Sequence, residues 1–307
     1  MQKYFLTRPV EAASTFNKSA IMTIFPCCKI NLGLNVVSRR PDGYHDLETV
    51  FFPVPLTDAL EVTTMDDDFP SDVPCDLLVK TANGGQMTAE TLCPEQQNLV
   101  VKAYNLLAEE HNMPRVHAHL IKRIPSQAGM GGGSSDAAAM ICLLNKAFDL
   151  GLTTHEMERY AARLGADCAF FITATPAYAT GIGDILTPLG DAANILAGYY
   201  LALVKPDIAV STGKAYGMIT PRKPAECCRD VVKRPVGEWR GRLTNDFEEP
   251  VFAMHPELGA IKERLYAMGA DFAMMSGSGS TIFGLFRNEP RDLDHIYDGC
   301  FVKVMKL

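Results

Sequence analysis

A glycine-rich segment near the middle of the chain constrains its fold and function more than any other feature. Residues 125–136 read PSQAGMGGGSSD, between an alternating stretch at 116–124 that predicts a β-strand and an apolar stretch at 137–150 that predicts a buried helix capped by Gly151. Consecutive glycines let backbone N–H groups converge on an anion, and the N-terminus of the helix adds further N–H groups and partial positive charge. Ser134 and Ser135 can donate to phosphate oxygens. We therefore expect a phosphate-binding loop rather than a tight packing turn.

Two common phosphate-binding motifs do not fit this segment. No lysine follows the glycines, as a Walker A loop requires, and Ser134 stands where a dinucleotide fingerprint needs its third glycine. The loop therefore belongs to another class.

Composition narrows the function classes. The chain has 307 residues, 47% of them hydrophobic, and a formal net charge of −7, which is typical of a globular chain of about two domains. A non-specific nucleic-acid binder usually shows clustered basic residues. The only such cluster, residues 222–242, is expected to be a solvated connecting segment. We expect no nucleic-acid partner, no membrane span and no obligate protein partner.

Cysteines and the N-terminus predict a cytoplasmic protein. The nine cysteines include two adjacent pairs, which are too close for ordinary disulfides, and none has a zinc-binding spacing. They are expected to be thiols in a reducing cytosol. Residues 1–21 lack a secretory signal and are interpreted as a short extension, with Met22 as a possible alternative start.

Hydrophobic patterning predicts an α+β chain. Strands are expected at 23–37 (one or two), 47–60, 76–79, 116–124, 168–172 and 199–204, and on both sides of a glycine-rich turn within 271–286. Helices are expected at 98–110, 137–150, 153–164 and 256–268, the third of them opened by a capping box of Thr153 and Glu156. A polar stretch at 186–195 is the candidate domain boundary.

Three motifs in the same order resemble the GHMP kinase superfamily. The phosphate loop of that superfamily is matched by Pro125, Gly129, Met130, Gly131, Gly132, Gly133, Ser134 and Ser135. CKINL at 28–32 is similar to its A-K-[IV]-N-L segment, and MSGSGST at 275–281 is similar to its second glycine-rich turn. These motifs are spread over the chain from about residue 23 to residue 285. The sequence departs from the family pattern at Cys28, 126–128 and 168–169, and these departures leave the motif residues in place.

The resemblance implies a two-domain GHMP kinase fold. Residues 1–187 would form the N-terminal ATP-binding α/β domain (ribosomal protein S5 domain 2-like), and residues 188–307 the C-terminal ferredoxin-like α+β domain. ATP and Mg²⁺ are the implied cosubstrate and ion, although no metal ligand is assigned.

PDGYHDL at 41–47 is similar to a segment of one branch, the kinases of diphosphocytidyl-methylerythritol. That likeness implies that Tyr44 and His45 hold a cytosine ring, and aromatic faces do stack on bases. The implied substrate is a small cytidine diphosphate compound that receives the γ-phosphoryl of ATP on its 2-hydroxyl, as a step toward isoprenoid precursors. The other implied substrate residues are Asn31, Thr212 and Tyr216.

The same resemblance implies the remaining roles. Lys29 and Asp167 match the catalytic pair of the family, with Asp167 as general base that also contacts substrate. The adenine side would be Asn98, Leu99, Val100 and Lys122.

Three alternatives remain open at this point. Another GHMP kinase, for mevalonate, homoserine or a sugar, is disfavoured by Tyr44 and His45. A catalytically dead binding protein is disfavoured because Lys29, Asp167 and the loop serines are all present. A nucleotide-binding regulatory module is disfavoured by the short chain without linkers.

Overall fold

The computed structural model describes residues 22–83, 86–89 and 93–307, which form two compact units. The first unit contains 22–28, Leu56–Ile124 and Gly131–Ala174, as far as these are described. The second contains Lys29–Pro55, Pro125–Met130 and Thr175–Leu307. The expected extension at 1–21 and the alternative start at its end lie outside, or at the edge of, the described residues. The chain passes between the units several times, so no single cut separates them. The boundary of the family domains at 187/188 stays a prediction.

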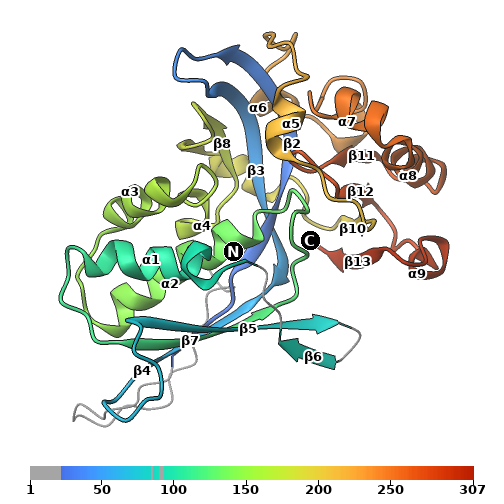
Figure 1. Cartoon of the computed structure of the whole chain (residues 1–307). Coiled ribbons are helices and arrows are strands. Elements are labelled where there is room, and N and C mark those ends of the chain that lie inside the picture. Colours follow the sequence, from blue (N-terminus) through green and yellow to red (C-terminus); the bar gives the residue numbers. More distant parts are fainter. Residues whose placement is uncertain (1–21, 84–85, 90–92) are drawn as a thin grey trace. The chain divides into compact units, whose positions relative to one another are not determined.

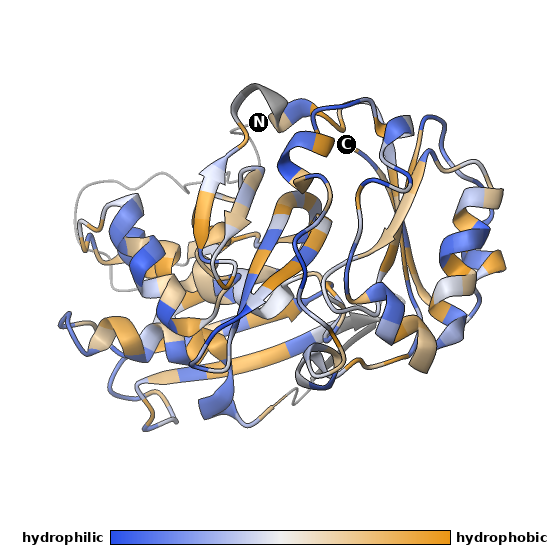
Figure 2. Cartoon of the chain, turned by 90° about the horizontal axis from the view of Figure 1, so that it is seen from above, coloured by the Kyte–Doolittle hydropathy of each residue, from blue (hydrophilic) through white to orange (hydrophobic). Residues whose placement is uncertain are grey.

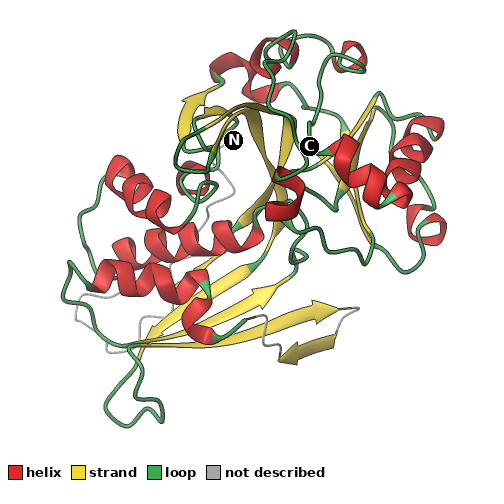
Figure 3. Cartoon of the chain, turned by 45° about the horizontal axis from the view of Figure 1, so that its top comes forward, coloured by secondary structure: helices red, strands yellow, loops and turns green. Residues whose placement is uncertain are grey.

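The first unit contains a five-stranded sheet in the order β1-β4-β7-β5-β6. Its strands are β1 (Met22–Ile24), β4 (Ala59–Thr64), β5 (Cys75–Asn83), β6 (Gln86–Ala89) and β7 (Val116–Lys122). Strands β5 and β7 are parallel and the other pairs are antiparallel. Helices α1 (Leu99–Ala108), α2 (Gly132–Ala147) and α3 (Thr154–Leu164) lie together on one side of this sheet (Figures 1 and 3). A short 3-10 helix, η1 (Glu95–Gln97), precedes α1. The alternating burial along β7 confirms the strand that its sequence predicted.

Helix α2 begins at Gly132, five residues earlier than predicted. The preceding residue, Gly131, has a φ of +70°, which lets the chain turn sharply into the helix. The expected cap at Gly151 is also wrong. The helix ends at Ala147, and Asp149 takes the left-handed conformation after it, with a φ of +49°.

The end of the first unit confirms one local prediction and corrects another. Thr153 and Glu156 form the expected capping box at the start of α3. The strand predicted at 168–172 is instead a turn followed by the short helix α4 (Phe170–Thr173). Periodicity cannot separate a strand from a buried helical turn in an apolar run this short, and burial of Phe170, Phe171 and Ile172 explains the run in either case.

The second unit contains two four-stranded sheets. One has the order β2-β3-β8-β9, with strands β2 (Cys27–Arg39), β3 (His45–Thr57), β8 (Ala177–Thr180) and β9 (Ile185–Pro188). The other has the order β11-β12-β10-β13, with strands β10 (Tyr200–Lys205), β11 (Phe272–Met275), β12 (Ile282–Phe286) and β13 (Phe301–Lys306). The expected strands at 23–37 are thus β1 and β2, which belong to different sheets. A turn closed by the Arg40 amide, which donates to the Tyr44 carbonyl at 2.8 Å, joins β2 to β3.

Helices cover the second of these sheets. The described helical segments of this unit are η2 (Gly190–Asn194), α5 (Thr212–Tyr216), α6 (Cys228–Val231), η3 (Val236–Glu238), α7 (Glu248–Met254), α8 (Pro256–Ala267) and α9 (Leu293–Ile296). Residues Val251, Leu258, Ile261 and Leu265 of α7 and α8 pack with Ala273, Met275 and Ile282 of the sheet in one buried cluster. The strands of this sheet carry mainly hydrophobic residues (Figure 2). The predicted helix at 256–268 and the strands around the glycine-rich turn are confirmed.

The basic stretch 222–242 is not the solvated connecting segment that we expected. Val231, Val232, Val236 and Trp239 are buried, and the indole Nε1 of Trp239 donates to the Arg234 carbonyl at 2.9 Å. The segment is therefore anchored by its apolar side chains, while its basic side chains reach the surface. Among the described residues, no helix has the length and apolar character of a membrane span.

Candidate functional site

The first half of the glycine-rich loop, Pro125–Met130, is fixed against the second glycine-rich turn. Ser276 Oγ donates to the Gly129 carbonyl at 3.0 Å, and the Thr281 amide donates to the Ala128 carbonyl at 3.3 Å. Gly129 has a φ of +72°, and a Cβ there would lie 2.0 Å from the Ser276 carbonyl oxygen. Only glycine fits this approach. The Lys29 amide also donates to the Met130 carbonyl at 3.0 Å, which ties the loop to β2.

Asn245 holds the second glycine-rich turn in place. Its side-chain Nδ2 donates to the carbonyls of Met275 and Gly277, both at 2.8 Å. Asn245 is buried and precedes α7 directly. One buried amide therefore supports the turn on which the phosphate loop rests.

The second half of the loop, Gly131–Ser135, forms the first turn of α2 in the first unit. The Ser135 amide donates to the Gly131 carbonyl at 2.9 Å. A Cβ on Gly132 would lie 3.0 Å from Ile124 and 3.3 Å from Lys122 Nζ, so glycine lets this turn lie close to the end of β7. The Ser135 bond is the first of the helix, so the N–H groups of Gly131, Gly132, Gly133 and Ser134 precede it and have no partner within the helix, as an anion requires.

A buried charge cluster lies directly beside this helix start. Lys122 Nζ donates to Asp58 Oδ2 and, at 2.6 Å, to Asp136 Oδ2. Asp58 Oδ1 also accepts from the amides of Arg123 and Ile124, the latter at 2.8 Å. Asp136 Oδ1 is buried without a hydrogen-bond partner among the described residues.

The pKa values of Asp136 and Lys122 are both raised, but for different reasons. Burial, outweighing the Lys122 charge, raises the pKa of Asp136 to about 7. Burial alone would lower the pKa of Lys122, but the two carboxylates outweigh it and the pKa is raised. One cation between two carboxylates leaves an excess negative charge, which favours retention of a proton at Asp136 because its second oxygen accepts no hydrogen bond.

Asp167 lies in the turn between α3 and α4, in the same unit as the loop serines. The pKa of the neighbouring Cys168 thiol shows which groups lie close to it. Burial raises the pKa of the Cys168 thiol to about 11, a hydrogen bond with Ser134 opposes that rise, and the charge of Asp167 adds to it. Ser134 and Asp167 are therefore both close to one thiol. The expected base and the expected phosphate-binding serine share a neighbourhood.

The other expected catalytic residue, Lys29, lies on β2 in the second unit. Its Nζ donates to Asn31 Oδ1 at 2.5 Å and lies 5.3 Å from the centre of the Phe51 ring. Asn31 Nδ2 donates to Thr49 Oγ1 at 2.8 Å, and Thr49 donates in turn to the Gly33 carbonyl. These side chains are buried and held in one orientation by β2 and β3.

An aromatic pair marks the expected cytidine side. The rings of His45 and Tyr216 stack with centroids 5.0 Å apart and an interplanar angle of 15°. Tyr44 is 61% exposed, and Thr212 Oγ1 lies 2.9 Å from Ser278 Oγ in the second glycine-rich turn. Residues from three separate stretches of the sequence thus meet in the second unit.

The expected adenine-side residues open helix α1 in the first unit. Asn98 caps the helix, with Oδ1 accepting from the Val100 amide at 3.0 Å, and Val100 is buried. Leu99 lies near Gly133, where a Cβ would be 3.8 Å from Leu99 Cδ1. Helices α1 and α2 therefore begin side by side. Lys122, expected on the same side, directs its ammonium to the two aspartates.

Sequence reasoning gave no role to Asp58, Asp136 and Asn245, and it identified Ser276 as part of the second glycine-rich turn without its partner. Asp58, Asp136, Asn245 and Ser276 each act through partners distant in sequence, up to 147 residues away. Asp136 was noted beside the loop without a role. A weak signal existed for Asn245, which starts the N-D-F stretch before α7. Asp58 gave no local signal, because a carboxylate in a strand connection is usually solvated.

Two family models match the chain. The GHMP kinases N terminal domain matches residues 98–175, and the GHMP kinases C terminal domain matches residues 231–299. The first match includes the glycine-rich loop and Asp167.

Curated relatives and solved structures agree with these matches. The chain is 48% identical to a 4-diphosphocytidyl-2-C-methyl-D-erythritol kinase of Bacteroides fragilis over 280 residues, covering 91% of this chain and 97% of the relative. It is 46% identical to the kinase of the same name from Parabacteroides distasonis, covering 92% and 98%. A crystal structure of 4-(cytidine 5'-diphospho)-2C-methyl-D-erythritol kinase matches with a TM-score of 0.69 and 29% identity, covering 93% of this chain and all of that chain. A mevalonate kinase from Methanococcus jannaschii, 12% identical with a TM-score of 0.62 over 93% and 97% of the two chains, shares the fold.

Proposed function

We propose which residues of this chain carry out its reaction, and the premise is its family. The chain belongs to the 4-diphosphocytidyl-2-C-methyl-D-erythritol kinase family of the GHMP kinases. It is an ATP-dependent kinase of the methylerythritol phosphate route to isoprenoid precursors. The reaction transfers the γ-phosphoryl of ATP to the 2-hydroxyl of the methylerythritol unit. The observation that carries this function is the identity of 46–48% over nine-tenths of the chain. Mevalonate and homoserine kinases share only the fold.

The ATP phosphates bind the loop formed by Pro125, Gly129, Met130, Gly131, Gly132, Gly133, Ser134 and Ser135. The free N–H groups at the start of α2 support this assignment, together with the two serine hydroxyls. Adenine lies against the start of α1, with Asn98, Leu99, Val100 and Lys122. Phosphoryl transfer passes through a loose transition state, so a rigid loop that positions the γ-phosphoryl supplies much of the catalysis.

Asp167 is the general base. It accepts the proton of the substrate 2-hydroxyl as that oxygen bonds to phosphorus, and the bond to the ADP oxygen breaks. Its closeness to the thiol that Ser134 also contacts supports the role. Lys29 stabilises negative charge on the transferred group, and Asn31 orients both Lys29 and the substrate.

The cytidine base binds beside the His45–Tyr216 stack. Exposed Tyr44 supplies a second aromatic face, and Thr212 lies at the edge of the second glycine-rich turn. An imidazole held by stacking can donate to or accept from a pyrimidine edge.

Mg²⁺ accompanies ATP in this proposal and is held mainly by phosphate oxygens. Among the described residues, no three histidine, cysteine or acidic side chains converge as a ready-made metal site. That fits Mg²⁺, which commonly takes one or two carboxylates together with substrate phosphates. We also propose a cytoplasmic location, supported by nine free cysteines.

An ADP-release assay with Mg·ATP tests the reaction, with the cytidine compound as substrate and mevalonate and homoserine as controls. Turnover with a control substrate alone would refute the cytidine assignment, and no turnover by folded protein would indicate a binding protein.

The base is tested by Asp167→Asn, which should lower kcat by about 10²–10⁴-fold with little change in KM for the cytidine substrate. Asp149→Asn is the matched control, because this exposed aspartate lies in the same unit and asparagine tolerates its positive φ. Equal turnover of the two variants would remove Asp167 from the mechanism.

A further inference from the structure

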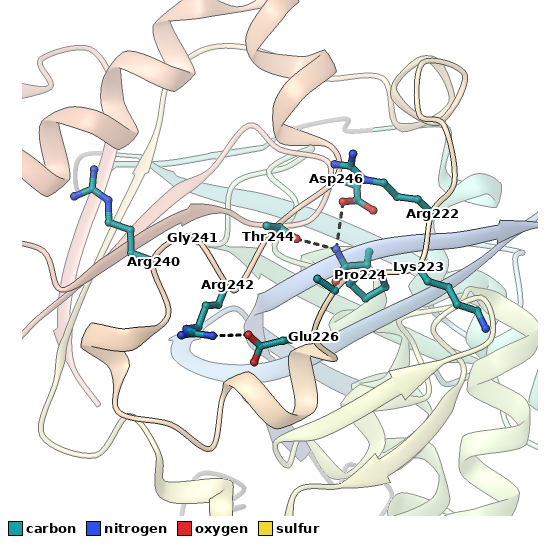
Figure 4. A pocket seen from close by; sticks show the side chains of 11 residues that line it. Arg222, Lys223, Pro224, Glu226, Arg240, Gly241, Arg242, Thr244 and Asp246 are labelled. Carbon is teal, nitrogen blue, oxygen red and sulfur yellow. Dashed lines mark hydrogen bonds and ion pairs between the residues drawn. The ribbon is translucent and has the colours of Figure 1, made fainter.

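The anchored basic segment 222–242 supplies two walls of a pocket whose lining includes none of the residues proposed for the reaction. The pocket has a volume of about 660 Å³, and its lining residues all belong to the second unit. Figure 4 shows their side chains. Arg222 and Lys223 line one wall, and Arg240 and Arg242 line another. The size falls within the range of small-molecule sites. Eight of the eleven lining residues are polar or charged, which favours a polar ligand.

The floor of this pocket is rigid. Val36 and Asn35 of β2 donate to Asp246, the Val36 amide at 2.8 Å and Asn35 Nδ2 at 3.2 Å, and Asn35 also donates to Thr244 Oγ1. The Arg222 amide donates to the Val36 carbonyl at 2.9 Å, which fixes the base of the first wall. A ligand here would meet a preformed surface.

Charge identifies the kind of ligand. Four basic side chains line the pocket against two carboxylates, and both carboxylates are already engaged. Asp246 accepts from Asn35 and Val36, while Glu226 accepts from Arg234 at 2.6 Å and Arg242 at 2.5 Å.

The side chains of Arg222 and Lys223 are the two cationic groups of the pocket that can bind a ligand. Among the residues the structure describes, neither Arg222 nor Lys223 has an ion pair within 4 Å, and both are exposed. We propose that this pocket binds a small phosphorylated anion, with Arg222 and Lys223 as its main contacts. Guanidinium groups recognise phosphate through paired hydrogen bonds, and lysine adds a point charge.

The pocket floor is also connected to the phosphate loop. Thr244 and Asp246 flank Asn245, whose amide supports the turn at 275–277, and Ser276 of that turn donates to Gly129. Because the floor is a rigid unit, a ligand that displaces Thr244 or Asp246 displaces Asn245 with them and so shifts the loop. Occupancy is expected to change the KM for ATP at least twofold.

Calorimetric titration of the full-length protein with inorganic pyrophosphate tests the binding site. Arg222→Ala/Lys223→Ala should weaken binding at least about tenfold, because it removes charge-assisted hydrogen bonds. Lys233→Ala, an exposed lysine of the same segment that pairs with Asp230 outside the pocket, should bind as the wild type does. Trp239, the only tryptophan, adjoins Arg240, so its fluorescence should follow the same titration.

Ser134→Ala separates this pocket from the phosphate loop. Binding that is lost in Ser134→Ala but kept in Arg222→Ala/Lys223→Ala would overturn the proposal, as would equal binding by all variants. Competition by glycerol 3-phosphate would assign the pocket to phosphorylated polyols, and competition by CDP would assign it to nucleotides. Unchanged KM for ATP with pyrophosphate bound in the pocket would overturn the connection to the loop.

Discussion

The two aspartates that share Lys122 should respond in opposite ways to the same substitution. Among the residues that the structure describes, Asp58 accepts hydrogen bonds from Lys122 and from two backbone amides, whereas Asp136 accepts only from Lys122. Asn at position 58 would weaken three bonds to a charged acceptor at once. Asn at position 136 would keep an oxygen for Lys122 and remove the excess buried negative charge.

The expected magnitudes follow from these contacts. Asp58→Asn should lower the free energy of unfolding by about 3–5 kcal/mol, as breaking a buried ion pair usually does. Asp136→Asn should change it by less than about 1 kcal/mol at pH 8, because a lost charge-assisted bond is offset by relief of repulsion between the two carboxylates.

The pH dependence gives an independent check. An aspartate in the unfolded chain has a pKa near 3.9, and Asp136 has a pKa of about 7 when folded. The folded state therefore binds more protons than the unfolded state between about pH 4 and pH 7. Protonated Asp136 therefore contributes to the free energy of unfolding at low pH. That contribution is lost as the pH rises through this window, and the loss amounts to at most about 4 kcal/mol. Asp136→Asn should remove that loss, so the variant should be less stable than the wild type at pH 5 and should come within about 1 kcal/mol of it at pH 8.

Urea unfolding of both variants and the wild type at pH 5 and pH 8 measures these effects. Circular dichroism reports the folded fraction, and equal m-values would confirm that the folded states are comparable. The reasoning would be refuted if Asp136→Asn were destabilised as much as Asp58→Asn at pH 8, or if its stability fell with pH as steeply as that of the wild type.

Three further substitutions test other parts of the structure. Gly129→Ala should raise the KM for ATP at least tenfold in steady-state assays, because its Cβ would lie 2.0 Å from the Ser276 carbonyl at a φ of +72°; an unchanged KM would mean that the loop does not need this contact. Thr153→Ala should cost about 1 kcal/mol in urea unfolding through loss of the capping box, with kcat unchanged. Asp246→Ala should cost about 2–3 kcal/mol, because Val36 and Asn35 lose a charged acceptor; a cost below 0.5 kcal/mol, roughly that of a surface change, would contradict the rigid floor.

Features that depend on neighbouring residues in the sequence could be predicted from the sequence alone. Glycines in succession before two serines indicated the phosphate loop, and Thr153 with Glu156 indicated a helix start, because such signals depend on neighbours in sequence. The family resemblance followed from three motifs in order. The strand predicted for the short apolar run 168–172 was wrong, because burial alone does not distinguish a strand from a helical turn.

Tertiary structure decided which distant groups meet. Asp58 and Asp136 reach Lys122 from opposite sides in sequence, and Asn245 supports a turn 30 residues later. The segment 222–242 became a pocket wall only because Trp239 and its apolar neighbours are buried. A pattern in sequence reports the preferences of a short stretch of chain, whereas the energy of a buried charge or hydrogen bond depends on partners that only folding brings together.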